Sequence, residues 1–102
     1  MDIELLSREP LRLAVTFAEA DACFHGHFPD RPVVPGSLFI GLCLWSIRKH
    51  AGQQNELTVR RFAFDRFAGP GRYELHIDAA DAVFHCALTQ EETIFARGRI
   101  AC

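Results

Sequence analysis

Residues 24–38, Phe24-His25-Gly26-His27-Phe28-Pro29-Asp30-Arg31-Pro32-Val33-Val34-Pro35-Gly36-Ser37-Leu38, decide how this chain is interpreted. His27 lies between Gly26 and the pair Phe28-Pro29, in a loop that three prolines restrict. Pro35-Gly36-Ser37 then opens a helix, because proline and serine favour the first positions of helices. The stretch therefore aims an imidazole at the N-terminus of a helix.

The predicted helix runs from Ser37 to about His50 and is apolar on almost every side, which normally means burial on most faces. The three basic residues at its end complement the C-terminal dipole, and Gly52 follows as the stop. Its apolar residues are Leu38, Phe39, Ile40, Leu42, Cys43, Leu44, Trp45 and Ile47.

The rest of the chain is typical of strands separated by short turns. Turns are expected at Pro70-Gly71 and at Gln90-Glu91-Glu92. One buried helix followed by an antiparallel meander predicts an α+β domain whose sheet wraps the helix. The expected strands are Leu11–Phe17, about Leu57–Phe67, Arg72–Asp78, Ala82–Thr89 and Thr93–Ala101.

Composition limits the possible functions. The 102 residues, 49% of them hydrophobic, predict one folded domain over residues 1–102. The net charge of −2 and the lack of a basic block do not favour nucleic acid, and the longest apolar run, Leu38–Trp45, is too short to span a membrane. Four scattered cysteines form no CxxC pair, and the pair His25 and His27 has no third ligand nearby, so we expect no metal. The acidic N-terminus is no signal peptide, so we expect a cytoplasmic protein with reduced thiols.

The stretch closely resembles the active-site motif of the hotdog-fold 3-hydroxyacyl-[acyl-carrier-protein] dehydratases of fatty acid and polyketide synthesis. Their pattern is similar to Gly-His-Phe-Pro, two variable residues, Pro, an apolar residue, one more position, then Pro-Gly. Gly26-His27-Phe28-Pro29, Pro32-Val33 and Pro35-Gly36 match it, with a spacing of nine from His27 to Gly36. In its length the chain resembles the compact dehydratase-like proteins of aryl-polyene-type pathways. The resemblance implies a hotdog fold, an antiparallel sheet wrapped around one long central helix.

Dehydration of a 3-hydroxyacyl thioester needs a base, a donor for the carbonyl oxygen and an acid for the departing hydroxyl. The resemblance implies that His27 is the base and that the helix start at Gly36 is the oxyanion donor. It also implies that no cofactor is needed, and that the substrate is a thioester on acyl carrier protein or coenzyme A. The expected substrate-binding residues are Phe24, Phe28, Pro35, Ser37 and Gly41.

The chain departs from the family pattern at the position of the acid. The dehydratases carry an Asp or Glu on the central helix, five residues after the glycine, and it enters the partner subunit's site; here that position is Gly41. Three explanations stay open. Asp21, Asp30 or Asp65 supplies the acid, a partner protein supplies it, or the chain has lost catalysis and kept binding.

Two other functions stay open: a non-catalytic acyl-binding or structural subunit of a dehydratase heterodimer, and a hotdog thioesterase. The missing acid counts against the thioesterase too, because that chemistry usually also needs a helix carboxylate. We expect a homodimer or a heterodimer with another hotdog protein, because a hotdog sheet leaves an edge exposed. Trp45 belongs to the core or to that interface. Arg60, Arg61 and Arg66 are either solvated or attract the phosphate of a carrier protein's phosphopantetheine.

Overall fold

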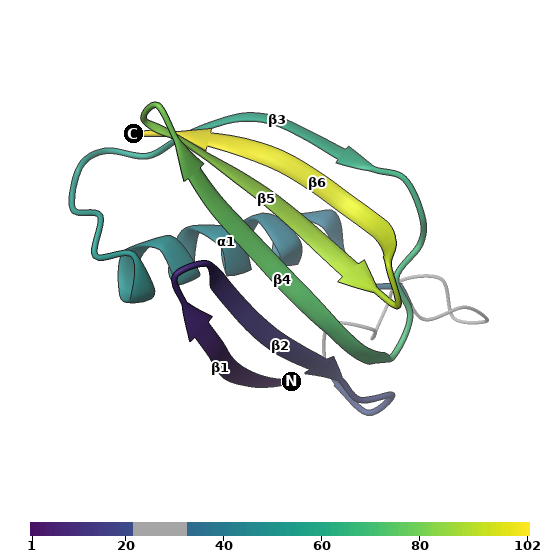
Figure 1. The fold of residues 1–102 in the computed structure, drawn as a ribbon. Helices are drawn as coiled ribbons and strands as arrows, with labels where there is room; N and C mark the ends of the chain where they lie inside the picture. The colour runs from purple at the N-terminus through teal and green to yellow at the C-terminus, as the bar shows by residue number, and fades with distance from the viewer. Residues whose placement is uncertain (22–32) are drawn as a thin grey trace.

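A computed structural model describes residues 1–21 and 33–102, where one long helix crosses one face of a six-stranded antiparallel sheet (Figure 1). The strand order is β1-β2-β4-β5-β6-β3, so β1 and β3 form the two edges. The elements are β1 (Asp2–Arg8), β2 (Leu11–Phe17), α1 (Gly36–His50), β3 (Thr58–Phe64), β4 (Gly71–Ala80), β5 (Val83–Gln90) and β6 (Thr93–Ala101). This arrangement confirms the predicted α+β hotdog fold. In the described residues no helix is long and apolar enough to cross a membrane.

The strands differ most from the prediction at β1 and β3, and β4 extends from Gly71 to Ala80, beyond the predicted Arg72–Asp78. β1 was not predicted, and its alternating residues Ile3 and Leu5 pack only partly buried against the core. β3 ends at Phe64 rather than at Phe67, because the N–H groups of the next two residues both donate to the carbonyl of Phe95, at 2.9 and 3.1 Å. The chain leaves the edge of the sheet at that point and turns toward the start of α1.

The core lies between the helix and the concave face of the sheet. Strand residues alternate, so that every second side chain faces α1. β2, β4 and β5 give the clearest alternation, with nearly all of their inward positions buried. The largest fully buried side chains are Phe17, Phe39, Leu13, Ile47, Leu75, Leu88, Ile100 and Val15.

The helix is not buried on every side. Ser37, Gly41 and Trp45 follow one another at intervals of four residues and are all exposed. Trp45 keeps 41% of its surface accessible, although it contacts the side chains of Lys49 and His50. The apolar character of α1 therefore exceeds what its own sheet covers, and the surplus lies on the face that includes Gly41.

Packing between the edge strand and the helix depends on Gly98 of β6. It pairs with Phe62 of β3, and a Cβ atom at residue 98 would overlap the Phe62 ring. The same ring meets Phe39 of α1 edge-on, with centroids 5.5 Å apart. Phe62 thus fills the space left by the missing side chain and connects the edge strand β3 to the helix.

Candidate active site

The start of α1 presents backbone N–H groups without intrahelical acceptors. Pro35 is the N-cap residue, has extended backbone angles and forms no side-chain cap. The N–H groups of Leu38 and Phe39 both donate to the Pro35 carbonyl, at 3.0 and 3.4 Å. Those of Gly36 and Ser37 come before any intrahelical acceptor. With no acidic residue in the first turn, the positive end of the helix dipole is open to a carbonyl oxygen or an anion.

A pocket of about 390 Å³ lies beside this helix start, within the usual size range of small-molecule sites. Its walls come from the residues before and within α1, from the end of β3 and the segment after it, and from β5 and β6. The lining is mainly apolar: Val33, Val34, Pro35, Gly36, Phe39, Phe64, Arg66, Phe67, Ala68, Leu88, Phe95 and Ala96. Arg66 is the single charged member of this lining among the described residues.

Hydrogen bonds fix the wall opposite the helix. The N–H of Val34 donates to the carbonyl of Ala68 at 2.7 Å, joining the residues before α1 to the segment after β3. The hydroxyl of Tyr73 donates to the carbonyl of Gly69 at 2.9 Å, and burial raises the pKa of this phenol. The pocket wall is therefore held from both of its ends.

Gly36 brings an aromatic ring against the helix start. A Cβ atom at residue 36 would lie 2.8 Å from Cζ of Phe64, too close for an undisturbed contact. The Phe64 ring also meets Phe39 edge-on, with centroids 6.1 Å apart, yet keeps 51% of its surface exposed. The missing side chain at residue 36 lets the Phe64 ring close one side of the pocket next to the helix start.

Only some of the predicted site residues lie at this pocket. Pro35 and Gly36 line the pocket, and Ser37 is exposed in the same helical turn. Gly41 is exposed one turn further along and does not line the pocket; a Cβ atom there would have nothing within 4 Å. The remaining predicted residues, His27, Phe24 and Phe28, lie outside the described residues, as do His25 and Asp30.

No carboxylate lines the pocket in the described part of the chain. Asp21 accepts hydrogen bonds from the Met1 amino group at 2.9 Å and from the Ala18 N–H at 2.8 Å. These two bonds, in that order, lower the pKa of Asp21. Asp65 pairs with Arg97 at 3.3 Å. Both carboxylates are therefore engaged elsewhere.

Phe64, Phe67 and Phe95 were not predicted to be pocket residues. A signal was present in the closely spaced aromatic residues of 62–67, two of which are exposed at 51% and 69%. Phe95 reaches the pocket only because β6 pairs with β3. Of the three arginines singled out in the sequence, Arg66 borders this pocket and Arg61 lines a different one. Within residues 1–21 and 33–102, no three His, Cys, Asp or Glu side chains gather as a metal site requires.

Comparison with known proteins supports the fold. The model of the ApeI-like family, described as ApeI dehydratase, matches residues 5–99. The dehydratase heterocomplex ApeI:P from Xenorhabdus doucetiae is similar in structure, with a TM-score of 0.77 and 18% identity over 99% of this chain and 93% of that chain.

Two further solved structures share the fold. An uncharacterized protein from Erwinia carotovora subsp. atroseptica has a TM-score of 0.65 and 18% identity, over 99% of this chain and 89% of its own. The TT0310 protein from Thermus thermophilus has a TM-score of 0.63 and 14% identity, over 97% of this chain and 90% of its own. No curated protein sequence matches the chain.

Proposed function

The chain belongs to the ApeI-like dehydratase family, and from this premise we propose that it dehydrates 3-hydroxyacyl thioesters together with a partner subunit. The observation that carries the proposal is the start of α1, where two N–H groups without intrahelical acceptors open beside an apolar pocket. An acyl chain suits this lining, and a thioester carbonyl suits these donors.

In the proposed reaction the thioester oxygen accepts hydrogen bonds from the N–H groups of Gly36 and Ser37. His27 removes a proton from the carbon next to the carbonyl, and negative charge develops on the oxygen that the helix start stabilises. An acid then protonates the hydroxyl on the next carbon. The C–O bond breaks, the carbon–carbon double bond forms, and water leaves. Pro35, Phe24 and Phe28 are proposed to bind the acyl group.

The missing acid defines what a partner subunit must supply. In the dehydratases this chain resembles, the helix acid enters the site of the other subunit, and Gly41 has no proton to give. A homodimer would therefore hold two sites without that acid, unless Asp21, Asp30 or Asp65 replaced it. In a heterodimer with an acid-bearing hotdog protein, the site that contains His27 would be complete and the other would receive only Gly41. We propose one working site per heterodimer. The likeness to a dehydratase heterocomplex supports pairing with a different chain, not the number of sites.

Exposed apolar residues support the proposed position of the interface. β3 is an edge strand with unpaired backbone groups, and such edges pair readily with another strand. Val59 and Phe64 on this strand, Phe67 beyond it and Trp45 on the open helix face are all large and at least 41% exposed. A second hotdog chain seated along β3 and α1 would cover all four and would bring its helix next to Gly41.

A second candidate function, a non-catalytic acyl-binding subunit, is favoured by the absence of a carboxylate from the described pocket. The two proposals share the thioester, on acyl carrier protein or coenzyme A, and Arg66 at the pocket is suited to the phosphate of either carrier. In either case we propose that the protein is cytoplasmic, because a reducing compartment suits the free thiols of Cys43, Cys86 and Cys102.

The test is a 3-hydroxyacyl-thioester dehydration assay of the purified chain, alone and mixed with hotdog proteins encoded nearby. We expect little turnover alone and clear turnover with the correct partner. In that complex, His27→Ala should cost at least about 10²-fold, the lower range for a general base. His25→Ala is the matched control and should cost much less. A complex whose activity survives His27→Ala would refute the mechanism, and a complex that binds the thioester without turnover would favour the non-catalytic subunit.

Assembly is tested separately by light scattering. We expect the isolated chain to form dimers, and Val59→Lys on the edge strand to weaken them without unfolding the monomer. A well-folded wild-type monomer at high micromolar concentration would contradict the proposed interface.

A further inference from the structure

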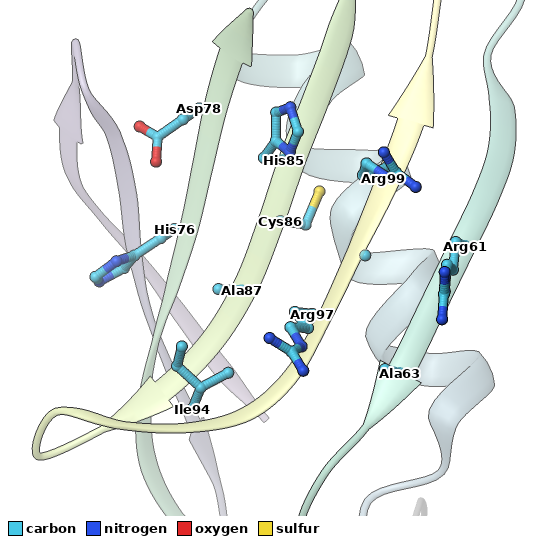
Figure 2. Close-up of a pocket in the computed structure, with 11 residues that line it drawn as sticks. Arg61, Ala63, His76, Asp78, His85, Cys86, Ala87, Ile94, Arg97 and Arg99 are labelled. Atoms are coloured by element: carbon cyan, nitrogen blue, oxygen red, sulfur yellow. The ribbon is translucent and has the colours of Figure 1, made fainter.

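The sheet has a second hollow, on the face away from the helix. It has a volume of about 470 Å³ and spans β4, β5, β6 and β3 (Figure 2). The Cys86 side chain is buried on the helix side, so its neighbours His85 and Ala87 point the opposite way. Figure 2 shows these two residues in front of the sheet, with the helix behind it.

Strand register arranges the hollow in two rows. In one row, Asp78 pairs with His85, His85 with Arg99, and Arg99 with Arg61. In the next row, Arg97 lies between Ala87 and Ala63. The small side chains of the two alanines form the floor of the hollow, and the longer side chains surround it.

The charges around this hollow are unbalanced. Arg97 has a carboxylate partner in Asp65 at 3.3 Å, and Asp78 is taken by Arg12 at 3.1 Å. Neither Arg61 nor Arg99 has an acidic partner among the described residues.

Arg61 and Arg99 are nevertheless direct cross-strand partners. Like charges in that relation destabilise a sheet. An anion placed between the two guanidinium groups would turn this repulsion into attraction, because each presents a fork of N–H donors that matches a carboxylate or a phosphate.

We propose that this hollow binds a small polyanion, a molecule with clustered phosphate or carboxylate groups, between Arg61 and Arg99 and next to Arg97. A compact ligand is favoured over a protein surface because the arginines surround a depression with a floor of small residues. The site lies on the opposite side of the sheet from the pocket at the helix start. Its existence does not depend on the dehydratase proposal.

The test is calorimetric titration of the full chain with sodium pyrophosphate and, separately, with sodium citrate, each against sodium chloride at equal ionic strength. We expect saturable binding of at least one of the two polyanions, and the stronger one identifies the preferred group. Arg99→Gln and Arg61→Gln should each weaken binding at least about tenfold, the loss expected for one charge-assisted contact. Arg60→Gln removes the same charge from the same strand outside the hollow, and should change affinity less than about twofold.

A second measurement locates the ligand. Amide NMR shifts induced by the polyanion should concentrate on Ala63, Ala87 and Gly98. Each variant is first compared with wild type by its melting curve without ligand. The proposal fails if neither polyanion binds better than chloride, if the Arg60 and Arg99 variants lose affinity equally, or if the shifts spread over the whole surface.

Discussion

Gly41→Glu restores a carboxylate at the helix position where the related dehydratases carry theirs, and it tests the missing-acid hypothesis directly. The substitution should be structurally mild, because residue 41 is exposed and nothing lies within 4 Å of its Cβ position. Glycine in a helix interior costs about 1 kcal/mol relative to alanine, and glutamate is a much better helix former. We expect the free energy of unfolding of the variant to rise by about 0.5 kcal/mol, and its denaturant midpoint to rise slightly.

The effect on the reaction should be far larger. A positioned proton donor contributes about 10²–10⁴-fold, so turnover of a 3-hydroxyacyl thioester by the isolated chain should rise within that range. Gly41→Gln is the matched control, since it has nearly the same shape and helix propensity but no proton to donate. Its turnover should stay at the wild-type level.

A Gly41→Glu variant that folds and dimerises as wild type but gains no activity would refute the missing-acid hypothesis, and so would an equal gain in the glutamine variant. The hypothesis also fails if wild-type homodimers already turn over robustly and lose this activity when Asp21, Asp30 or Asp65 is changed. That outcome would place the acid on this chain and remove the need for a partner.

Three further predictions concern stability and are checked by denaturant unfolding. Gly98→Ala should lower the free energy of unfolding by about 1–3 kcal/mol, because the new methyl group overlaps the Phe62 ring. This loss should disappear in a Phe62→Ala background. An equal loss in both backgrounds would exclude the ring as the cause. Ala82→Gly should stabilise by about 0.5–1 kcal/mol, since residue 82 has a φ of 62°, whereas Ala79→Gly in the adjoining strand should destabilise. Burial, then the charges of Arg8 and Lys49, lower the pKa of His50 from its ordinary 6.5. The unfolded chain then binds this proton more readily, so stability should fall as the pH drops below about 6.5, and His50→Gln should reduce that fall.

Local sequence signals predicted the helix and most strands well. Pro35 and Gly36 mark a start, and the predicted helix differs from the observed one by a single residue at that end. β1 was not predicted, because the alternation of polar and apolar residues covers only Asp2 to Leu5 before Leu6 interrupts it. The hairpin turn before β5 has Asp81 and Ala82 at φ of 50° and 62°, without the glycine that usually marks such a turn.

The candidate site was predictable only in its local part. Pro35 and Gly36 belong to one short motif, and both line the pocket. Phe64 and Phe95 are distant in the sequence and meet because the edge strand β3 pairs with β6. Such pairing is a long-range property that no window of sequence contains. The part of the prediction that rests on His27 stays a prediction.

The physical origin of each proposed catalytic function explains why the acid is the one that this chain can most easily lack. The proposed oxyanion donors are backbone groups, and removing them would require unfolding the start of α1. A side chain added at Gly36 would keep the N–H group but would collide with the Phe64 ring. The acid, by contrast, depends on one side chain at an exposed position that packs against nothing in the described chain. Its loss costs the fold almost nothing, while loss of the donors would damage the pocket itself. A subunit that keeps the donors and lacks the acid is therefore a stable solution, provided that another chain brings a carboxylate to the same site.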